Sequence, residues 1–226
     1  MEDSKFRDIF SLRHIIVGLF GLITIAVMVV AINQTPESSV NPADTIHAAS
    51  AETGNLPEKI IGDAENAKVI VYEYADYACA HCAEQNQTVK DLVEEYDGKI
   101  AVVFRSYDLK LHNGAAAAKA ATAAAIQGCW EAYKDLLFAN QAEWYYATAS
   151  GAEALFCDYF ETASKGLGDV QKFVKDMYSD EVAKRVAFEN EMGDKVKLRG
   201  TPLFRIDGDN VVVTKLAEVI EAKIIE

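Results

Sequence analysis

Cys79 and Cys82 are separated by two residues and directly follow an apolar run that predicts a buried strand. This spacing lets a small disulfide ring open and close reversibly when the first cysteine begins a helix. Unpaired backbone N–H groups and the positive end of the helix dipole favour a thiolate there, so we expect Cys79 to have a low pKa. His81 can add a donor or a positive charge near the same sulfur. Because a stable thiolate makes the oxidised pair easier to reduce, the motif predicts thiol–disulfide exchange.

Other roles for these residues stay open. Two cysteines at this spacing form half of many zinc sites, but a structural zinc site needs four ligands, and the chain has neither a second CxxC nor an HxxxH pattern. A purely structural disulfide between Cys79 and Cys82 is a further alternative, and His81 can simply be a solvated residue at a helix start. We expect the chemistry to need no bound cofactor and no metal.

The N-terminus predicts the compartment. Residues 15–32 contain eighteen positions without a charge, which as a helix would extend about 27 Å against a hydrocarbon core of about 30 Å. Lys5, Arg7 and Arg13 precede this run and no Lys or Arg follows it before Lys59, so the positive-inside rule places residues 1–14 in the cytoplasm. A cleaved signal peptide is the alternative.

This topology defines the expected domain organisation. Residues 15–32 are expected to be a single transmembrane anchor in the cell membrane. Residues 33–57 are rich in Ser, Thr, Asn, Pro and Ala and predict a flexible stalk. Residues 58–226 are then the folded catalytic part on the extracytoplasmic side.

Composition excludes one class of partner. The formal net charge is −13 and the pI is near 4.8, whereas nucleic-acid binding needs a basic surface that displaces counterions. Half of the residues are apolar and a quarter are charged, which is typical of a globular domain with one sizeable core.

The pattern of apolar residues places the cysteine pair between predicted elements. Strands are expected at 68–75 and 100–104, and again at 202–206 and 211–213 around the turn 207–210. Helices are expected at 79–96 and 216–225, and throughout a long stretch, 112–198, that is broken near Gly128, Gly151, residues 166–168 and Ser179.

These features together resemble a known family. A strand running into CxxC, a long helical insertion, and Gly200-Thr201-Pro202 before the last hairpin resemble the DsbA family of thioredoxin-fold oxidoreductases, especially its membrane-anchored members of the BdbD type. The segment 128–141, GCWEAYKDLLFANQ, is also typical of that family. The resemblance covers roughly residues 56–226. It implies an α/β thioredoxin fold with an inserted helical domain.

The resemblance also implies roles for individual residues. Cys79 would be the attacked, solvent-facing sulfur and Cys82 the buried resolving one. Pro202 would be cis and face the disulfide, with the backbone of Thr201 free to pair with an extended substrate strand. Glu73 matches a buried acid that passes protons to and from Cys82, although a strand-edge carboxylate is the alternative.

The implied activity is that of a dithiol oxidase. It would donate its disulfide to exported cysteine-containing proteins and be reoxidised by a DsbB-like or VKOR-like membrane partner. Ala80 and Thr201 depart from residues common in the family, which leaves the direction open, so a disulfide reductase or isomerase is the main alternative. A non-catalytic peptide-binding module is a minor one.

Several residues outside the motif carry weaker signals. Cys129 and Cys157 predict a structural disulfide in an oxidising compartment, with two unpaired buried cysteines as the alternative. The cluster Trp144-Tyr145-Tyr146 either lines a peptide groove or packs between helices. His47 and His112 are expected at the surface.

Overall fold

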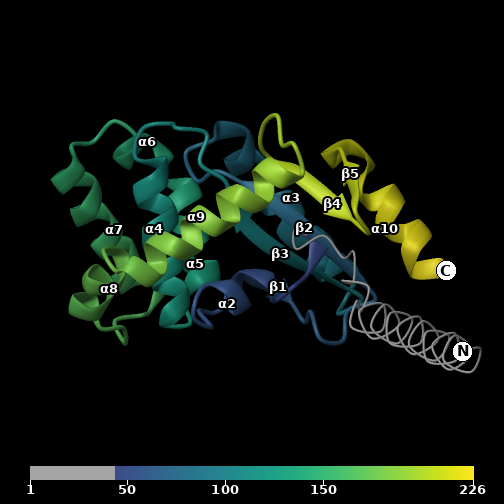
Figure 1. Ribbon diagram of the computed structural model, residues 1–226, viewed down its shortest axis with the longest axis horizontal. Helices are drawn as coiled ribbons and strands as arrows, with labels where there is room; N and C mark the ends of the chain where they lie inside the picture. The colour runs from purple at the N-terminus through teal and green to yellow at the C-terminus, as the bar shows by residue number, and fades with distance from the viewer. Residues whose placement is uncertain (1–43) are drawn as a thin grey trace, which may run out of the picture. The chain divides into compact units, whose positions relative to one another are not determined.

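A five-stranded mixed sheet forms the centre of the computed structural model, which describes residues 44–226 (Figure 1). Its strands, in the order β1-β3-β2-β4-β5, are β1 (Ile60–Gly62), β3 (Ile100–Ser106), β2 (Val69–Ala75), β4 (Leu203–Ile206) and β5 (Asp209–Val211). β2 runs parallel to β3, and the other neighbours are antiparallel. Every residue of β3 is buried and β2 is nearly so, as expected for central strands covered on both faces.

Helices cover the sheet and fill a long insertion. α3 (Ala80–Glu95) follows β2, and α10 (Leu216–Ile225) closes the chain. Between β3 and β4 lie α4 (Gly114–Ile126), α5 (Trp130–Ala139), α6 (Gln141–Trp144), α7 (Ala149–Ala163), α8 (Val170–Met177) and α9 (Asp180–Lys195). These six helices occupy the segment that the sequence predicts as helical. In Figure 1, α4 to α8 lie to one side of the sheet, and α9 runs from them back across the strands.

The predicted break near Gly151 is confirmed: α6 ends at Trp144 and α7 begins at Ala149, so that Gly151 itself lies in the first turn of α7. The backbone N–H of Gly151 donates to the hydroxyl of Thr148 at 3.1 Å, which caps that helix. A residue in the first turn has no intrahelical partner for its N–H, so a capping threonine overrides the weak helix propensity of glycine.

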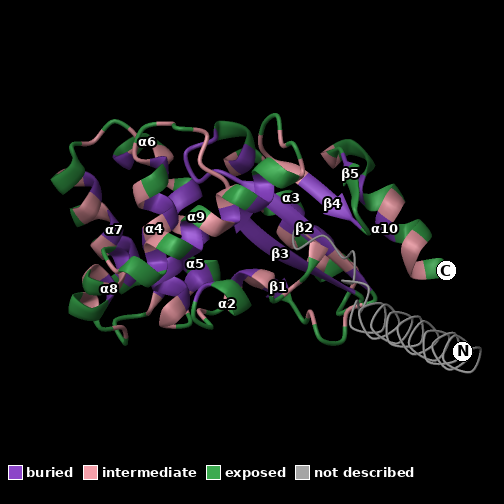
Figure 2. Cartoon of the chain, viewed as in Figure 1, coloured by how far each residue is buried: buried purple, intermediate pink, exposed green. Residues whose placement is uncertain are grey.

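The alanine-rich helix α4 lies at the centre of the inserted block. Ala117, Ala120, Ala121, Ala123 and Ala124 are fully buried, and α5, α8 and α9 pack around the helix. Alanine has the highest helix propensity and a side chain small enough to let neighbouring helices approach closely. Figure 2 shows the resulting buried interior of this block.

The predicted stalk is wrong for residues 44–57, which are folded. They contain α2 (Ala48–Glu52), whose Ala49 is fully buried, and Asp44 forms an ion pair with Arg205 at 3.0 Å. The hydroxyl of Ser50 also donates to Glu58 at 2.6 Å. Composition alone suggested a linker, but one buried alanine and several polar contacts are enough to fix the segment on the domain.

The predicted anchor, 15–32, lies outside the described residues, as does the rest of the predicted stalk. Within residues 44–226, none of the helices combines the length and the hydrophobicity needed to cross a bilayer.

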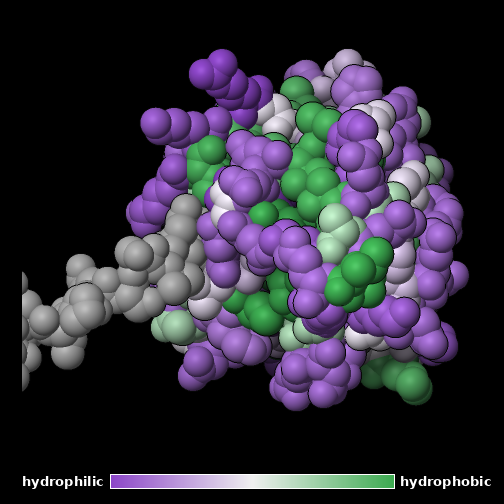
Figure 3. Space-filling view, turned by 90° about the vertical axis from the view of Figure 1, so that its right-hand side faces the viewer, coloured by the Kyte–Doolittle hydropathy of each residue, from purple (hydrophilic) through white to green (hydrophobic). Residues whose placement is uncertain are grey.

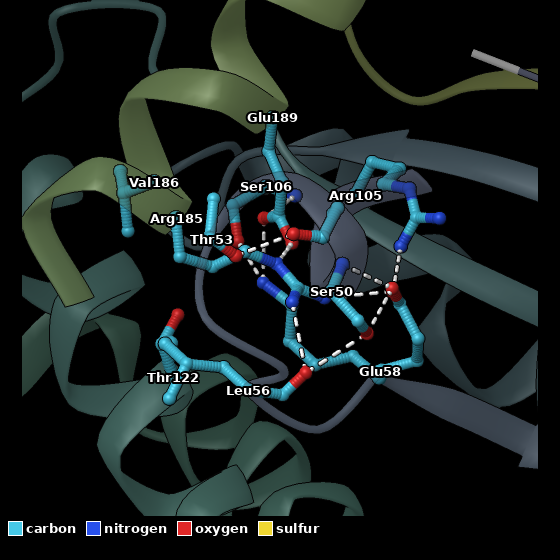
Figure 4. A network of polar contacts seen from close by, with 12 residues as sticks. Ser50, Thr53, Leu56, Glu58, Arg105, Ser106, Thr122, Arg185, Val186 and Glu189 are labelled. Carbon is cyan, nitrogen blue, oxygen red and sulfur yellow. Dashed lines mark hydrogen bonds and ion pairs between the residues drawn. The ribbon is translucent and has the colours of Figure 1, made fainter. Parts of the chain in front are cut away.

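A buried network of charges joins the inserted helices to the sheet (Figure 4). Glu189 of α9 accepts hydrogen bonds from Lys59 and from Arg185, each at 2.7 Å. Glu58 pairs with Arg185 at 2.7 Å and with Arg105 of β3. All five side chains are almost fully buried, so the network fastens α9 to β3 and to the segment that leads into β1.

One face of the molecule shows hydrophobic side chains among hydrophilic ones (Figure 3). It is the side on which α10 and β5 lie in Figure 1. Val212 and Ile225 are exposed there, while Leu216 and Ile220 of the same C-terminal segment are buried. The last helix therefore packs on the domain through one face only.

Candidate active site

Cys79 and Cys82 lie at the N-terminal end of α3, as the sequence predicts. Cys79 is the N-cap residue, and its carbonyl accepts from the backbone N–H of Cys82 at 3.1 Å and of Ala83 at 3.2 Å. Cys79 keeps 7% of its surface exposed, whereas Cys82 is fully buried. Both are thiols, so the structure represents the reduced form of the pair.

The two thiols differ in their tendency to ionise. A hydrogen bond from the Cys82 thiol lowers the pKa of Cys79 to about 5, and the Thr201 side chain and the backbone N–H groups of Cys82 and His81 act in the same direction against the effect of burial. Burial, together with the bond to Cys79, raises the pKa of Cys82 well above its ordinary value. At neutral pH the site therefore holds a thiolate at Cys79 and a thiol at Cys82.

Thr201 faces the cysteine pair from the loop before β4. The Thr201–Pro202 peptide is cis, in agreement with the prediction. The Cys79 sulfur lies 3.5 Å from the carbonyl oxygen of Thr201. The Thr201 hydroxyl is buried and makes no hydrogen bond of ordinary geometry within residues 44–226. Because the same hydroxyl helps to lower the pKa of Cys79, it lies where it can donate to the thiolate.

His81 is a solvated residue at the start of α3, with 79% of its side chain exposed. Its Nδ1 lies 3.1 Å from a carboxylate oxygen of Glu84. That hydrogen bond and the charge of Glu84 raise the pKa of His81, with a smaller effect from Cys79. Its environment therefore favours the protonated form of His81, whose direct contact is with Glu84.

Glu73 lies on the central strand β2, in register with Phe104 on one side and Phe204 on the other. Only 3% of its surface is exposed, so the alternative of a strand-edge carboxylate is wrong. Burial raises the pKa of Glu73 to about 7, against the opposing charge of Lys134. No hydrogen bond joins Glu73 to Cys82 among the described residues, so proton transfer between them stays a prediction.

Asp76 is a site residue that the sequence analysis missed. It follows β2 directly and is 2% exposed. Its two carboxylate oxygens accept from the backbone N–H groups of Ala78 and Leu109, each at 2.8 Å. Burial raises the pKa of Asp76 to about 6, and the nearby Cys79 contributes. The sequence signal that could have found Asp76 is an acidic residue between an apolar strand and the cysteine motif. Asp76 holds the turn before Cys79 against the loop after β3.

Gly114 is required at the start of α4 because this helix approaches Asp76 closely. A Cβ atom at Gly114 would lie 2.9 Å from a carboxylate oxygen of Asp76 and 3.3 Å from the Cβ of Ala78. Contacts this short would displace the carboxylate from its two N–H partners. The glycine therefore lets the inserted block reach the turn before Cys79.

The segment 128–141 brings the inserted block to the same turn. Gln141 donates its side-chain N–H to the carbonyl oxygens of Tyr77 at 2.6 Å and Cys79 at 3.1 Å. The indole N–H of Trp130 donates to the Tyr77 hydroxyl at 2.9 Å. Residues from the insertion thus hold the backbone that carries the reactive cysteine.

The predicted disulfide between Cys129 and Cys157 is absent from the structure, where both are free thiols. The Cys129 thiol lies 3.5 Å from the carbonyl oxygen of Ala124 at the end of α4 and can donate to it. Burial raises the pKa of both cysteines, so neither is an activated thiolate. Because the Cys79–Cys82 pair is likewise reduced in this structure, the disulfide between Cys129 and Cys157 stays a prediction.

In the aromatic cluster, packing between helices is confirmed for Trp144, and the role of the two tyrosines in a peptide groove stays a prediction. Trp144 is fully buried and donates its indole N–H to the carbonyl of Leu137 at 2.9 Å. Tyr145 is half-buried and Tyr146 is 79% exposed. His112 is exposed but not isolated, because its ring lies 5.4 Å from that of Tyr145 and 5.0 Å from that of Tyr146.

The predictions for His47 and for the turn after β4 are confirmed. His47 is exposed. Asp207 and Gly208 both have positive φ angles, 49° and 87°, as a tight hairpin turn between β4 and β5 requires.

Comparison with known proteins extends these observations. The structure resembles that of oxidised BdbD from Bacillus subtilis, with a TM-score of 0.65 and 16% identity over 75% of this chain and 94% of that one. It also resembles the thiol-disulfide exchange protein alpha-DsbA2 from Wolbachia pipientis, with a TM-score of 0.62 and 20% identity over 81% of this chain and 94% of that one. Both likenesses concern the fold.

Among curated proteins, a Na(+)/H(+) antiporter, NhaA 3 of Salinispora tropica, is 32% identical over 144 residues, which cover 63% of this chain and 20% of the antiporter. The chain thus spans about a fifth of the length of the curated relatives that it matches.

A family model described as thioredoxin matches residues 55–224. That range contains the sheet, the cysteine pair at the start of α3, the inserted helices and the cis proline. The chain belongs to the thioredoxin family.

Proposed function

We propose that this chain is an extracytoplasmic dithiol oxidase that donates the Cys79–Cys82 disulfide to exported proteins. The observation that carries the proposal is the contrast between the two thiols: a pKa of about 5 at Cys79 and a strongly raised pKa at Cys82. A protein that stabilises its thiolate this well favours its own reduced form and therefore oxidises other dithiols.

The reaction proceeds in two exchange steps. A substrate thiolate attacks the sulfur of Cys79, the bond to Cys82 breaks, and the Cys82 sulfur leaves with the electron pair and takes up a proton. A second substrate thiolate then attacks the substrate sulfur of the mixed disulfide, and Cys79 leaves as a thiolate. The substrate has lost two electrons and gained a disulfide, and the protein holds both electrons as a thiolate and a thiol.

Individual residues support separate parts of this cycle. The Thr201 hydroxyl can donate to the departing Cys79 thiolate. The backbone of Thr201, beside the Cys79 sulfur, is the expected pairing site for an extended substrate strand. Glu73, with a pKa of about 7, is half-protonated near neutral pH and is suited to supply the proton that Cys82 takes up.

The location and the partners form part of the proposal. The apolar run 15–32 and the charges before it support a single membrane anchor with residues 58–226 outside the cytoplasm. Reoxidation then requires a membrane protein that accepts two electrons from the dithiol, of the DsbB-like or VKOR-like class. The N-terminal location is tested in a chain whose four cysteines are replaced by serine. A single cysteine added at position 10 or 40 is exposed to a membrane-impermeant maleimide in whole cells, where only position 40 should react.

The direction of exchange is tested by equilibrating the full chain with glutathione buffers and measuring the fraction oxidised. A dithiol oxidase should have a reduction potential above about −180 mV, the value typical of protein disulfide isomerase. A value near −270 mV, as in thioredoxin, would instead support a reductase that uses the same cysteines.

A further inference from the structure

Asp76 connects three parts of the molecule beside the reactive cysteine. Its carboxylate oxygens accept from the backbone N–H groups of Ala78 and of Leu109, each at 2.8 Å. Its backbone carbonyl accepts from the N–H of Cys79 at 3.0 Å. Gly114, the first residue of α4, packs so closely that a Cβ atom there would lie 2.9 Å from the carboxylate. The buried carboxylate is therefore fixed on the same turn as the residue that carries the reactive sulfur.

The charged groups around this carboxylate are mainly acidic. Burial raises the pKa of Asp76 to about 6, against its two N–H bonds, and the charges of Asp108 and of the Cys79 thiolate add to the rise. Lys110 lies on the same loop as Asp108, but it is exposed and pairs with Asp108 at 2.8 Å. The first turn of α4 contributes only glycine and alanine. Within residues 44–226, no ion pair to Asp76 offsets a second negative charge on this turn.

Reduction of the cysteine pair creates such a second charge. The disulfide is neutral, whereas the reduced pair carries a thiolate at Cys79. A carboxyl group beside a thiolate binds a proton more tightly than the same group beside a disulfide, because like charges in a buried site disfavour each other. The oxidised pair therefore favours an ionised Asp76 and the reduced pair a neutral one, so that the turn keeps one negative charge in both forms.

We propose that Asp76 takes up a proton from solvent when the Cys79–Cys82 pair is reduced and returns it when the pair is oxidised. Two electrons from a substrate dithiol or from two glutathione thiols break the S–S bond, Cys82 takes up one proton, and Asp76 takes up a second one in place of Cys79. The inference rests on the proposed exchange reaction and holds for either direction of it. Asp76 is a positioning residue in this reaction, because it acts through Cys79.

The pH dependence of the glutathione equilibrium tests this assignment. The full chain is equilibrated at pH 5.5 and 6.5, and the reduced fraction of the Cys79–Cys82 pair is read by mass spectrometry after alkylation. Every chain carries His81→Asn, because His81 also senses the Cys79 charge. If only Cys82 takes up a proton, the equilibrium constant for reduction rises about eight- to tenfold over this pH unit. Proton uptake by Asp76 should limit the rise to about threefold.

Asp76→Asn should restore the eight- to tenfold rise, because the amide has the same shape but does not titrate. Asp63→Asn is the matched control. Asp63 also follows a strand, β1, and its carboxylate also accepts two backbone N–H groups, from Glu65 at 3.1 Å and from Asn66 at 3.3 Å. A hydrogen bond from the Asn66 side chain lowers the pKa of Asp63, so this variant should keep the threefold rise.

Infrared difference spectra of the chain with Asp76 intact supply a second measurement, which decides the question if Asp76→Asn does not fold. At pH 5.5, the spectrum of the reduced form minus that of the oxidised form should show the carbonyl band of a neutral carboxyl group. Carbon-13 in the aspartate carboxyl groups should shift this band, which separates aspartate from the buried Glu73.

The outcomes separate this inference from the function on which it rests. An eight- to tenfold rise in the chain that keeps Asp76, or a threefold rise that survives in Asp76→Asn, would overturn the assignment. A missing carboxyl band, or one that the isotope does not shift, would overturn it as well. Each of these results leaves the exchange reaction intact, whereas failure of the chain to exchange with glutathione at either pH would overturn both.

Discussion

The sulfur of Cys79 lies 3.5 Å from the carbonyl oxygen of Thr201, although 122 positions separate the two residues in the chain. The contact places the loop before β4 against the start of α3. It also brings the buried hydroxyl of Thr201 next to the Cys79 sulfur, which ionises. Among the described residues, this hydroxyl makes no hydrogen bond of ordinary geometry. The chemistry of the pair therefore depends on a residue that the cysteine motif does not include.

Thr201→Val should make the chain a weaker oxidant. Valine has nearly the same shape but lacks the hydroxyl donor, so the pKa of Cys79 should rise and the equilibrium with glutathione should shift about three- to tenfold toward the disulfide. Thiolate absorbance at 240 nm against pH checks the first effect. Thr214→Val, at an exposed threonine, should change neither quantity, and an unchanged thiolate titration in Thr201→Val would remove the hydroxyl from the account of this site.

Cys82→Ala should accumulate mixed disulfides through Cys79. Without the resolving thiol, a single-cysteine substrate bonded to Cys79 can be released only by a thiol from another molecule. Non-reducing gels of the full chain incubated with an unfolded single-cysteine protein and with glutathione disulfide, which accepts the two electrons, should show a shifted band that disappears with dithiothreitol. Cys79→Ser in the same background should show none, since burial raises the pKa of the remaining thiols, Cys129 and Cys157. A non-catalytic binding module would trap no substrate in either variant.

The reduced form should gain stability over the oxidised form as the pH rises from 4 to 7. Folding lowers the pKa of Cys79 from 9.0 to about 5. The resulting stabilisation is complete above pH 9 and is lost as the pH falls through 5, and the disulfide form has no such group. After a discount for solvent screening at the surface edge of the site, about 1 to 2 kcal/mol of this stabilisation remains at pH 7.

Denaturant unfolding of both redox forms at each pH measures this difference. The comparison across pH removes the constant effect of the disulfide on the unfolded chain. In the reduced form of Cys79→Ser, the free energy of unfolding should no longer show the increase between pH 5 and 7 that the Cys79 thiolate contributes. A free-energy difference between the redox forms that stays constant from pH 4 to 7 would contradict a stabilised thiolate.

Glu189→Gln should destabilise the fold by about 3 kcal/mol or more, because it leaves buried cations without one of their two carboxylates. Burial alone would raise the pKa of Glu189, but Lys59, Arg185 and Arg105 lower it from 4.5 to about 2. The stabilisation that the Glu189 carboxylate contributes to the fold is therefore fully present above pH 4.5 and is lost as the pH falls through 2.

Urea unfolding at pH 7 measures the loss of stability in Glu189→Gln. The difference in the free energy of unfolding between the original chain and this variant should become smaller below pH 4.5. Glu191→Gln is the matched control on the same helix, because Glu191 is 59% exposed and pairs with Lys195 at the surface; its effect should stay within about 0.5 kcal/mol. Equal losses from the two substitutions would mean that the buried network does not hold α9 in place.

Much of the architecture follows from short-range patterns in the sequence. The strand before Cys79, the helix that it begins, and the tight turn at Asp207 and Gly208 are set by local apolar spacing and turn chemistry, and all three are present. The cis peptide before Pro202 was expected only from family resemblance, because base rates favour trans.

The features that could not be predicted from the sequence depend on contacts between distant segments. Asp76 looked like an ordinary polar residue after a strand, and only the fold shows that Leu109 and Gly114 surround its carboxylate. The three-residue strand β1 has no sequence pattern of its own and is defined by pairing with β3.

The buried charge network that links α9 to β3 through Glu58 has a consequence for how a substrate is received. α9 leads directly into the loop that carries Thr201, and α4 abuts Asp76 at the other edge of the motif. Because both ends of the inserted block are tied to the sheet, the surfaces around Cys79 are preorganised before any polypeptide arrives. Little conformational entropy then remains to be lost on association, so weak contacts with many different sequences can still give useful affinity.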